Sequence, residues 1–211
     1  ADIERLEALS DDNKLGMLFY RPQEEGADSK AVRLKLYHRD EPIHLSDVMP
    51  MLENLGLRVI GESPYEIEKN NGQTFWILDF SMLHKSERTV DLREARDRFQ
   101  QAFADIWAGN LESDGFNRLL LGASLSGREI SILRAYARYM RQVGFPFSQQ
   151  YIEDTLSHYP DLATGLVKLF TKRFDPKHKG SEKGQNDLIK KLTEQLDRVE
   201  SLDDDRIIRR Y

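Results

Sequence analysis

The stretch YHRDEPIHLSDVMPMLENLGLRVI, residues 37–60, decides the fold. It predicts the end of a strand, a tight loop, a helix, a turn and a second strand. Pro42 stops the first strand because it has no N–H to give to a ladder. We expect Ser46 to cap the helix and Gly56 to end it in a left-handed conformation. The apolar face of that helix is predicted to hold Val48, Met51, Leu52 and Leu55.

The residues on either side of this stretch predict more of a sheet. Residues 32–37 alternate apolar and polar side chains, and residues 74–80 are rich in aromatic and β-branched ones, so both are predicted strands. Asn71–Gly72 is a hairpin signal, and an amphipathic helix follows from about Asp91. The order strand, helix, strand, strand, helix is most of a ferredoxin-like fold. No fourth strand is visible downstream, and residues 16–20 are the candidate for the missing edge.

The second half of the chain has only helical signals. Ser126 and Glu129 form a capping box, and the helix behind it carries an apolar stripe wide enough for two or more neighbours. Arg134, Arg138 and Arg141 share its other face, which we expect to be solvated or paired with acids. The sequence therefore predicts an α+β chain in three parts: a helix and strand extension at 1–30, a ferredoxin-like domain at 31–110, and a helical domain at 111–211. A lysine- and glycine-rich mobile loop is expected at about 176–186.

Composition excludes several classes of protein. The 211 residues carry a net charge of −5 and no cysteine, which disfavours polyanion binding, disulfides and thiolate metal sites. No apolar run is long enough for a membrane span, so we expect a cytoplasmic location and no membrane partner. The five histidines are scattered, and no glycine-rich dinucleotide motif or nucleophile elbow occurs. The sequence thus predicts no catalytic, cofactor-binding or metal residue in this segment.

A helix-turn-helix DNA-binding unit is the alternative interpretation. Residues 125–133 are typical of its first helix. The helix after it, residues 149–156, would have to enter the major groove, yet it has two acids and no basic residue. Acids that face phosphates repel them, so capping of a bundle helix is the preferred interpretation, without a nucleic-acid partner.

The first stretch resembles the ACT domain, a ferredoxin-like βαββα module that often binds amino acids. The fit includes Asp40, Pro42, Leu45 and Ser46, while Ile43 stands where that family usually has glycine. The resemblance implies a possible effector loop formed by Asp40, Pro42, Ile43, Leu45 and Ser46. A β-branched side chain at Ile43 resists the backbone conformation that lets a ligand approach closely.

The whole chain resembles a segment of the large bacterial NAD-specific glutamate dehydrogenases. The stretches that carry this resemblance are FYRP at 19–22, LKLYHRDEPIHLSDVMPMLENLGLRVIGESPYEI from Leu34, WILDFSM from Trp76, and IWAGNLESDGFNRLLLGASLSGREISILRAYARYMRQVGFPFSQQYIEDTL from Ile106. It implies an excerpt of a longer polypeptide, in its N-terminal half and upstream of a catalytic domain that oxidises L-glutamate with NAD and water to 2-oxoglutarate and ammonium. NAD would bind to that domain and not to this segment.

Two roles for the segment follow from the resemblance. The first is assembly, in which a sheet edge without its fourth strand and the wide helical stripe hold the catalytic domain of the same polypeptide or a homo-oligomer together. The second is allosteric regulation, in which an amino acid binds to the effector loop.

Overall fold

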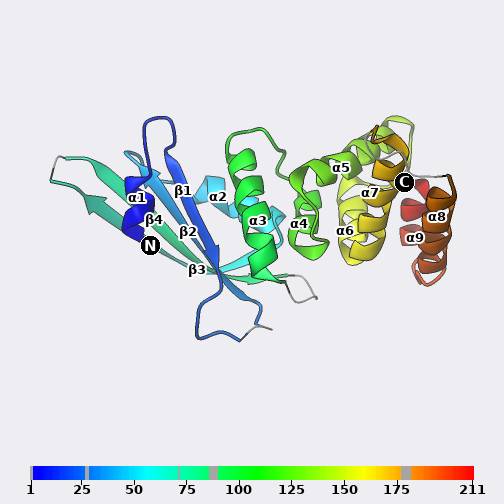
Figure 1. The fold of residues 1–211 in the computed structure, drawn as a ribbon, viewed down its shortest axis with the longest axis horizontal. Coiled ribbons are helices and arrows are strands. Elements are labelled where there is room, and N and C mark those ends of the chain that lie inside the picture. The colour runs from blue at the N-terminus through cyan, green and yellow to red at the C-terminus, as the bar shows by residue number, and fades with distance from the viewer. Residues whose placement is uncertain (1, 27–28, 71, 86–89, 177–181) are drawn as a thin grey trace. The chain divides into compact units, whose positions relative to one another are not determined.

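The computed structural model describes residues 2–26, 29–70, 72–85, 90–176 and 182–211. The chain forms two compact units, Ala1–Asp114 and Gly115–Tyr211. The first unit is α+β and the second is helical, as the sequence predicts (Figure 1). Each unit has its own core.

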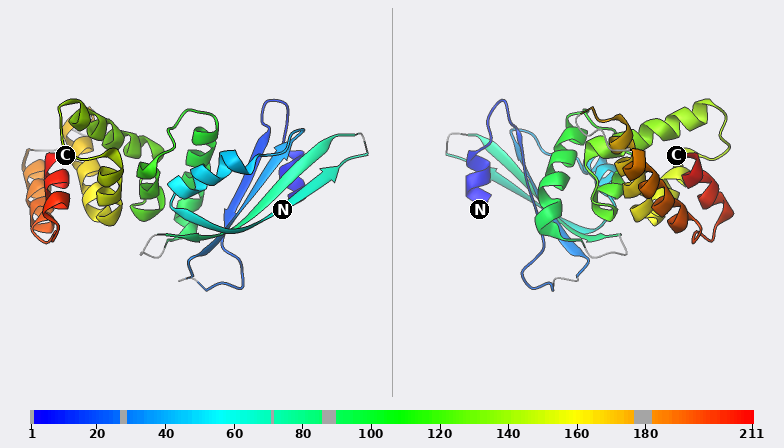
Figure 2. Two further views of the ribbon diagram at one scale, coloured as in Figure 1. Left: turned by 180° about the vertical axis from the view of Figure 1, so that it is seen from behind. Right: turned by 45° about the vertical axis from the view of Figure 1, so that its right-hand side comes forward.

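The first unit is built on a four-stranded antiparallel sheet with strand order β1-β2-β4-β3. Helices α2 and α3 pack on one face of this sheet, and α1 packs on the other (Figures 1 and 2). Its elements are α1 (Asp2–Glu7), β1 (Leu15–Tyr20), β2 (Ala31–Arg39), α2 (Leu45–Asn54), β3 (Leu57–Glu68), β4 (Thr74–His84) and α3 (Leu92–Trp107).

The fourth strand comes from the start of the chain. β1 pairs antiparallel with β2, with Leu15 opposite His38 and Tyr20 opposite Arg33. It lies beside the strand that opens the ferredoxin-like order, which confirms the candidate at residues 16–20. The expectation that this edge lacks a partner is therefore wrong.

Strand alternation divides the core of the first unit between the two faces. Phe19 of β1 stacks on Phe99 of α3, with ring centroids 4.0 Å apart. Tyr37 of β2 lies on the opposite face, where it joins Leu6 and Leu9 at the end of α1 in a second buried cluster with Phe75. Both faces are thus covered in part, and the sheet is not an open platform.

The outer edge of β1 is closed by side chains. Phe19 N–H donates to Gln100 Oε1 at 3.2 Å, and Phe19 C=O accepts from Arg96 Nε at 3.0 Å. Two residues earlier on the same strand, Met17 C=O accepts from Arg5 of α1 at 2.6 Å. Three of the backbone groups that a further strand would use are thus already bound, which disfavours pairing at this edge.

The outer edge of β3 is also unsuited to a further strand. Lys69 N–H donates to Gln73 C=O at 2.9 Å. Since hydrogen-bonded and non-hydrogen-bonded pairs alternate along an antiparallel hairpin, this bond determines which residues of β3 direct their backbone groups toward β4. That alternation turns the backbone groups of Pro64 and of its even-numbered neighbours away from β4. Pro64 has no N–H, and the neighbours Glu62, Glu66 and Glu68 are exposed or half-buried acids. Sheet extension is disfavoured at this edge as well.

The second unit is built from helices in the part of it that the structure describes. Its elements are η1 (Gly115–Arg118), α4 (Leu119–Gly122), α5 (Gly127–Gln142), α6 (Gln149–His158), α7 (Pro160–Phe174), α8 (Glu182–Leu196) and α9 (Leu202–Arg210). The capping box of α5 is present, with Ser126 N–H donating to Glu129 Oε2 at 2.8 Å. Of the loop expected at 176–186, residues 177–181 lie outside the described residues, and 182–186 are helical because α8 begins at Glu182.

Two side chains lie deeper than the sequence predicts. Arg134, expected on a solvated face of α5, is 3% exposed, and one of its terminal nitrogens donates to Asn117 Oδ1 at 2.7 Å. Its guanidinium also lies 5.8 Å from the ring centre of Phe116. His84, expected at the surface, is buried at the end of β4. Hydrogen bonding and the ring make the burial of the Arg134 charge possible.

Candidate functional site

The loop between β2 and α2 is held in one conformation by its own backbone. Asp40 adopts a left-handed conformation with φ of 72°, which aspartate tolerates better than most residues. Its N–H donates to Thr74 C=O at 2.9 Å. The Asp40 carboxylate lies 3.3 Å from Arg39, which also contacts Asp11 at 3.0 Å. The loop is therefore tied to β4 and to the chain before β1.

The five residues of the predicted effector loop do not form one site. Asp40, Pro42, Leu45 and Ser46 are exposed, whereas Ile43 is 6% exposed and belongs to the core. Ser46 is not the cap: α2 begins at Leu45, the N-cap residue is His44, and the Ser46 hydroxyl lies 3.3 Å from Asp47 Oδ1. The helix starts before Ser46 because His44 already has the extended conformation of a cap, with ψ of 129°.

A hollow of about 290 Å³ opens beside this loop. Its walls come from β2, the loop, the first turn of α2 and the end of α3. The lining residues are His38, Glu41, Pro42, Ile43, His44, Asp47 and Trp107. His38 Nδ1 lies 2.8 Å from Glu41 C=O, and its ring is 6.3 Å from that of Trp107. Of the five predicted residues, only Pro42 and Ile43 line the hollow.

The remaining lining residues were missed by the sequence analysis. Asp47 follows His44 by three residues, so one helical turn brings them together, and this spacing could have been noticed. Trp107 is far from the loop in sequence, and no local pattern connects the two.

The hollow combines two acidic side chains with the N-terminal turn of α2. Glu41 and Asp47 offer carboxylates for an ammonium group. None of the described residues that line it is Lys or Arg. A ligand carboxylate would instead meet the N–H groups at the start of α2, where the His44 side chain makes no capping hydrogen bond.

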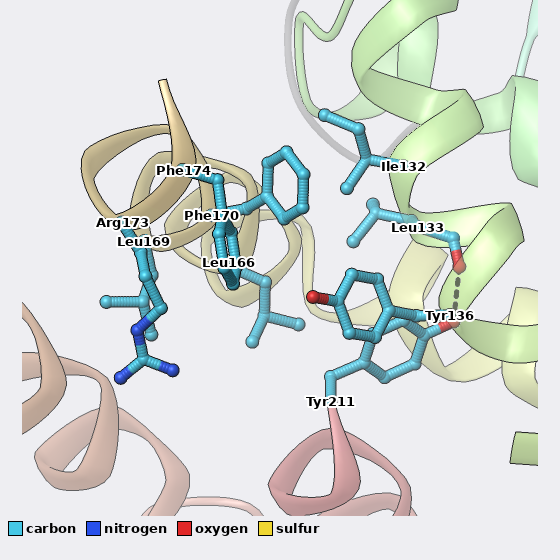
Figure 3. A pocket seen from close by; sticks show the side chains of 9 residues that line it. All are labelled: Ile132, Leu133, Tyr136, Leu166, Leu169, Phe170, Arg173, Phe174 and Tyr211. Carbon is cyan, nitrogen blue, oxygen red and sulfur yellow. Dashed lines mark hydrogen bonds between the residues drawn. The ribbon is translucent and has the colours of Figure 1, made fainter. Parts of the chain in front are cut away.

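The second unit has a smaller and more apolar pocket between α5 and α7 (Figure 3). Its volume is about 50 Å³. The lining side chains are Ile132, Leu133, Tyr136, Leu166, Leu169, Phe170, Arg173, Phe174 and Tyr211. Tyr211 closes one end: its hydroxyl donates to Leu133 C=O at 3.1 Å. Burial, followed by the nearby charge of Glu153, raises the pKa of the Tyr211 hydroxyl, so it remains protonated.

A corner between α5 and α6 gathers aromatic side chains. Gly144 has φ of 81° and ends α5, with Phe145 N–H donating to Met140 C=O at 3.0 Å. Phe147 lies between Phe145 and Tyr151, with ring centroids 5.1 Å and 5.4 Å away. We define the aromatic corner as Tyr139, Val143, Phe145, Phe147 and Tyr151. Tyr139 and Val143 are 60% and 50% exposed.

The described residues do not fit a dinucleotide site. The sheet is antiparallel, and the turn from β2 to α2 contains no glycine to bring a backbone against a pyrophosphate. Within the described ranges no group of three or more His, Asp or Glu side chains could hold a metal ion. No helix in the described part of the chain has the length and hydropathy of a membrane span.

A DNA-binding helix-turn-helix is not supported. Ile152 and Leu156 of α6 are buried in the unit. Asp154, which lies on the exposed side of α6, forms an ion pair with Arg118 at 2.7 Å. An exposed acid on the helix that would enter the groove disfavours contact with phosphates.

Comparison with known proteins assigns both units to one family. Residues 14–95 match the sequence model of the glutamate dehydrogenase ACT3 domain, a range that includes β1. Residues 111–176 match glutamate dehydrogenase helical motif 3.

Three relatives share the full length of the chain. All are called NAD-specific glutamate dehydrogenase: that of Halomonas elongata is 45% identical over 210 residues, that of Pseudomonas aeruginosa 42% over 214, and that of Mycobacterium tuberculosis 32% over 217. The chain spans 13% of the length of each. It therefore belongs to the NAD-specific glutamate dehydrogenase family, of which it carries the ACT3 domain and helical motif 3.

Proposed function

We propose that the chain is a non-catalytic assembly segment of a large cytoplasmic glutamate dehydrogenase. The whole enzyme would oxidise L-glutamate with NAD and water to 2-oxoglutarate, ammonium and NADH. The observation that carries this proposal is the alignment of the complete chain with enzymes of that name, of which it is a small part. The catalytic residues and the NAD site would belong to another part of the polypeptide.

Assembly would use side chains of the second unit and not a sheet edge. Further pairing is disfavoured at both outer strands of the sheet, by side-chain hydrogen bonds at β1 and by Pro64 at β3. The aromatic corner, in contrast, exposes Tyr139, Val143 and Tyr151. Tyr and Phe are enriched at protein interfaces, and Tyr is one of the residue types that often supply most of the binding energy. This corner would contact the catalytic domain or another subunit of a homo-oligomer.

The test is made in the full-length enzyme. Tyr139→Ala combined with Val143→Ala should weaken subunit association by about tenfold or more, the loss typical of interface hot spots. Light scattering over a range of concentrations measures the association, and glutamate-dependent NADH formation measures activity. Tyr65→Ala with Ile67→Ala, an exposed pair on β3, is the matched control. Unchanged association together with unchanged activity in the first variant would contradict the assembly role of the corner, and absence of glutamate-dependent NADH formation in the wild type would contradict the enzyme assignment.

Amino-acid sensing at the hollow is a second candidate. It is favoured by the two carboxylates of Glu41 and Asp47 beside the open N-terminal turn of α2. A bound amino acid would place its ammonium group against Asp47 and its carboxylate against the N–H groups of that turn. Ile43 does not close the hollow, because its side chain is buried beneath it.

Calorimetric titration with glutamate, aspartate and arginine tests this candidate. Saturable binding of one of them to the wild type is expected, with a loss of about tenfold in Asp47→Asn because an ion-paired hydrogen bond is removed. Glu53→Gln is the control, since Glu53 is an exposed acid of the same helix outside the hollow. Equal affinity in the two variants would contradict the proposed site.

A further inference from the structure

The pocket between α5 and α7 has room for a short aliphatic group. A cavity needs a volume of roughly 10–15 Å³, counted as the space open to the centre of a water-sized sphere, to hold one water molecule. At about 50 Å³ the pocket exceeds that several times. It is also open to solvent on one side, where Phe174 is 56% exposed.

The walls of the pocket are mostly apolar. The Phe170 ring meets Tyr136 edge-on at 6.1 Å and lies 4.9 Å from Phe174. The α7 side of the pocket is completed by Leu166, one helical turn before Phe170, and by Leu169, one turn before Arg173 (Figure 3). Such walls favour a branched hydrocarbon over a polar group.

Two donors remain at this pocket for a polar group. The Tyr211 hydroxyl is bound to Leu133 C=O and does not count. The Tyr136 hydroxyl is directed toward the Leu166 side of the pocket, and Arg173 supplies a guanidinium at its rim (Figure 3). None of the described residues that line the pocket is an acid.

We propose that this pocket binds a short aliphatic carboxylate. Its hydrocarbon would lie between Leu166 and Tyr136, and its carboxylate would contact Arg173. An ammonium group would be repelled by the guanidinium, and a neutral ligand would lose the charge-assisted hydrogen bond. The site differs from the hollow of the first unit and goes beyond the proposed assembly role.

Isovalerate is the probe, and its neutral isostere isovaleramide is the comparison. The 211-residue chain is titrated with each while the methyl resonances of Ile132, Leu133, Leu166 and Leu169 are followed by NMR. A ligand of this size should bind in the millimolar range. Isovalerate should bind roughly threefold more tightly than the amide, the value of an exposed ion pair, and the difference should shrink at high salt.

Two variants test whether Arg173 causes the tighter binding of the acid. Arg173→Gln should bind acid and amide equally, whereas Lys172→Gln, which removes the neighbouring exposed cation outside the pocket, should keep the preference. The methyl of Ile3, an exposed residue of the first unit, is the internal reference and should not shift. The proposal is overturned if acid and amide bind the wild type equally, if the pocket methyls do not shift, or if Ile3 shifts in parallel with them.

Discussion

Arg134 shows how far a single side chain can depart from its sequence pattern. It shares a helical face with Arg138 and Arg141, yet it is buried and they are exposed. The difference is made by η1, which places Asn117 and the ring of Phe116 beside Arg134. Asn117 lies 17 residues away in the chain, so helical periodicity could not show this contact.

Arg134→Ala should lower the free energy of unfolding of the second unit by about 3 kcal/mol, because it removes a buried hydrogen-bonded cation and its packing. Arg141→Ala, on the exposed side of the same helix, should cost less than about 1 kcal/mol. Denaturant unfolding followed by far-ultraviolet circular dichroism measures both. Similar losses in the two variants would contradict a special role for Arg134.

Tyr37 gives the first unit a dependence on alkaline pH. Its hydroxyl donates to Asp2 Oδ1 at 2.8 Å, and burial together with this hydrogen bond raises its pKa. A raised pKa in the folded state means that the contribution to stability is complete below the unfolded value of about 10 and is lost as the pH rises through the folded value.

Tyr37→Phe should therefore lose less stability than the wild type when the pH is raised above about 10. Both tryptophans, Trp76 and Trp107, lie in the first unit, so tryptophan fluorescence during urea unfolding follows it selectively. Parallel curves for the two proteins across this pH range would show that the Tyr37 hydroxyl does not titrate with unfolding.

At the scale of elements, the closed edge of β1 depends on two side chains of α3. Replacing both Arg96 and Gln100 by Ala should free the N–H and C=O of Phe19. The free edge can then pair with another chain, so we expect greater self-association by light scattering. Gln101→Ala, which removes only an exposed contact to Asp105, is the control and should leave association unchanged.

The contact between α7 and α8 depends on the absence of a side chain at Gly165. A Cβ at this position would collide with Leu192 Cδ2 and lie 3.3 Å from Leu192 Cγ. Gly165→Ala should therefore destabilise the second unit by about 1–2 kcal/mol through overpacking. A Cβ at Gly122 would have open space around it, so Gly122→Ala should be neutral. Thermal unfolding of the two variants and the wild type measures the difference.

Elements with local signals were predicted well, and those that depend on distant partners were not. The capping box of Ser126 and Glu129 was readable because a cap involves residues within one turn. The position of β1 beside β2 was only a candidate, since pairing across a polar loop leaves no periodic trace. The start of α2 was misplaced by two residues, with Ser46 expected as the cap in place of His44, because His44 has no side-chain capping bond to reveal it. Of the residues that line the hollow, Pro42 and Ile43 were among those predicted, but Trp107 was not.

The whole molecule contains two cores that should unfold separately. Tryptophan fluorescence reports the first unit alone, and circular dichroism of helices is weighted toward the second. In a guanidinium titration we expect the two signals to give different midpoints. Superimposable curves would show instead that the two units unfold as one cooperative body.

The strand order of the first unit has a consequence for its synthesis on the ribosome. β1 and β2 emerge as neighbours, so the nascent chain can begin this sheet as a local hairpin before α2 and α3 have been synthesised. Arg96 and Gln100, which bind the Phe19 backbone at the edge of β1, however, come from α3 and leave the exit tunnel only after all four strands. During that interval the nascent chain has a complete sheet whose β1 edge lacks the hydrogen bonds from α3. This is the stage at which a chaperone would protect it most.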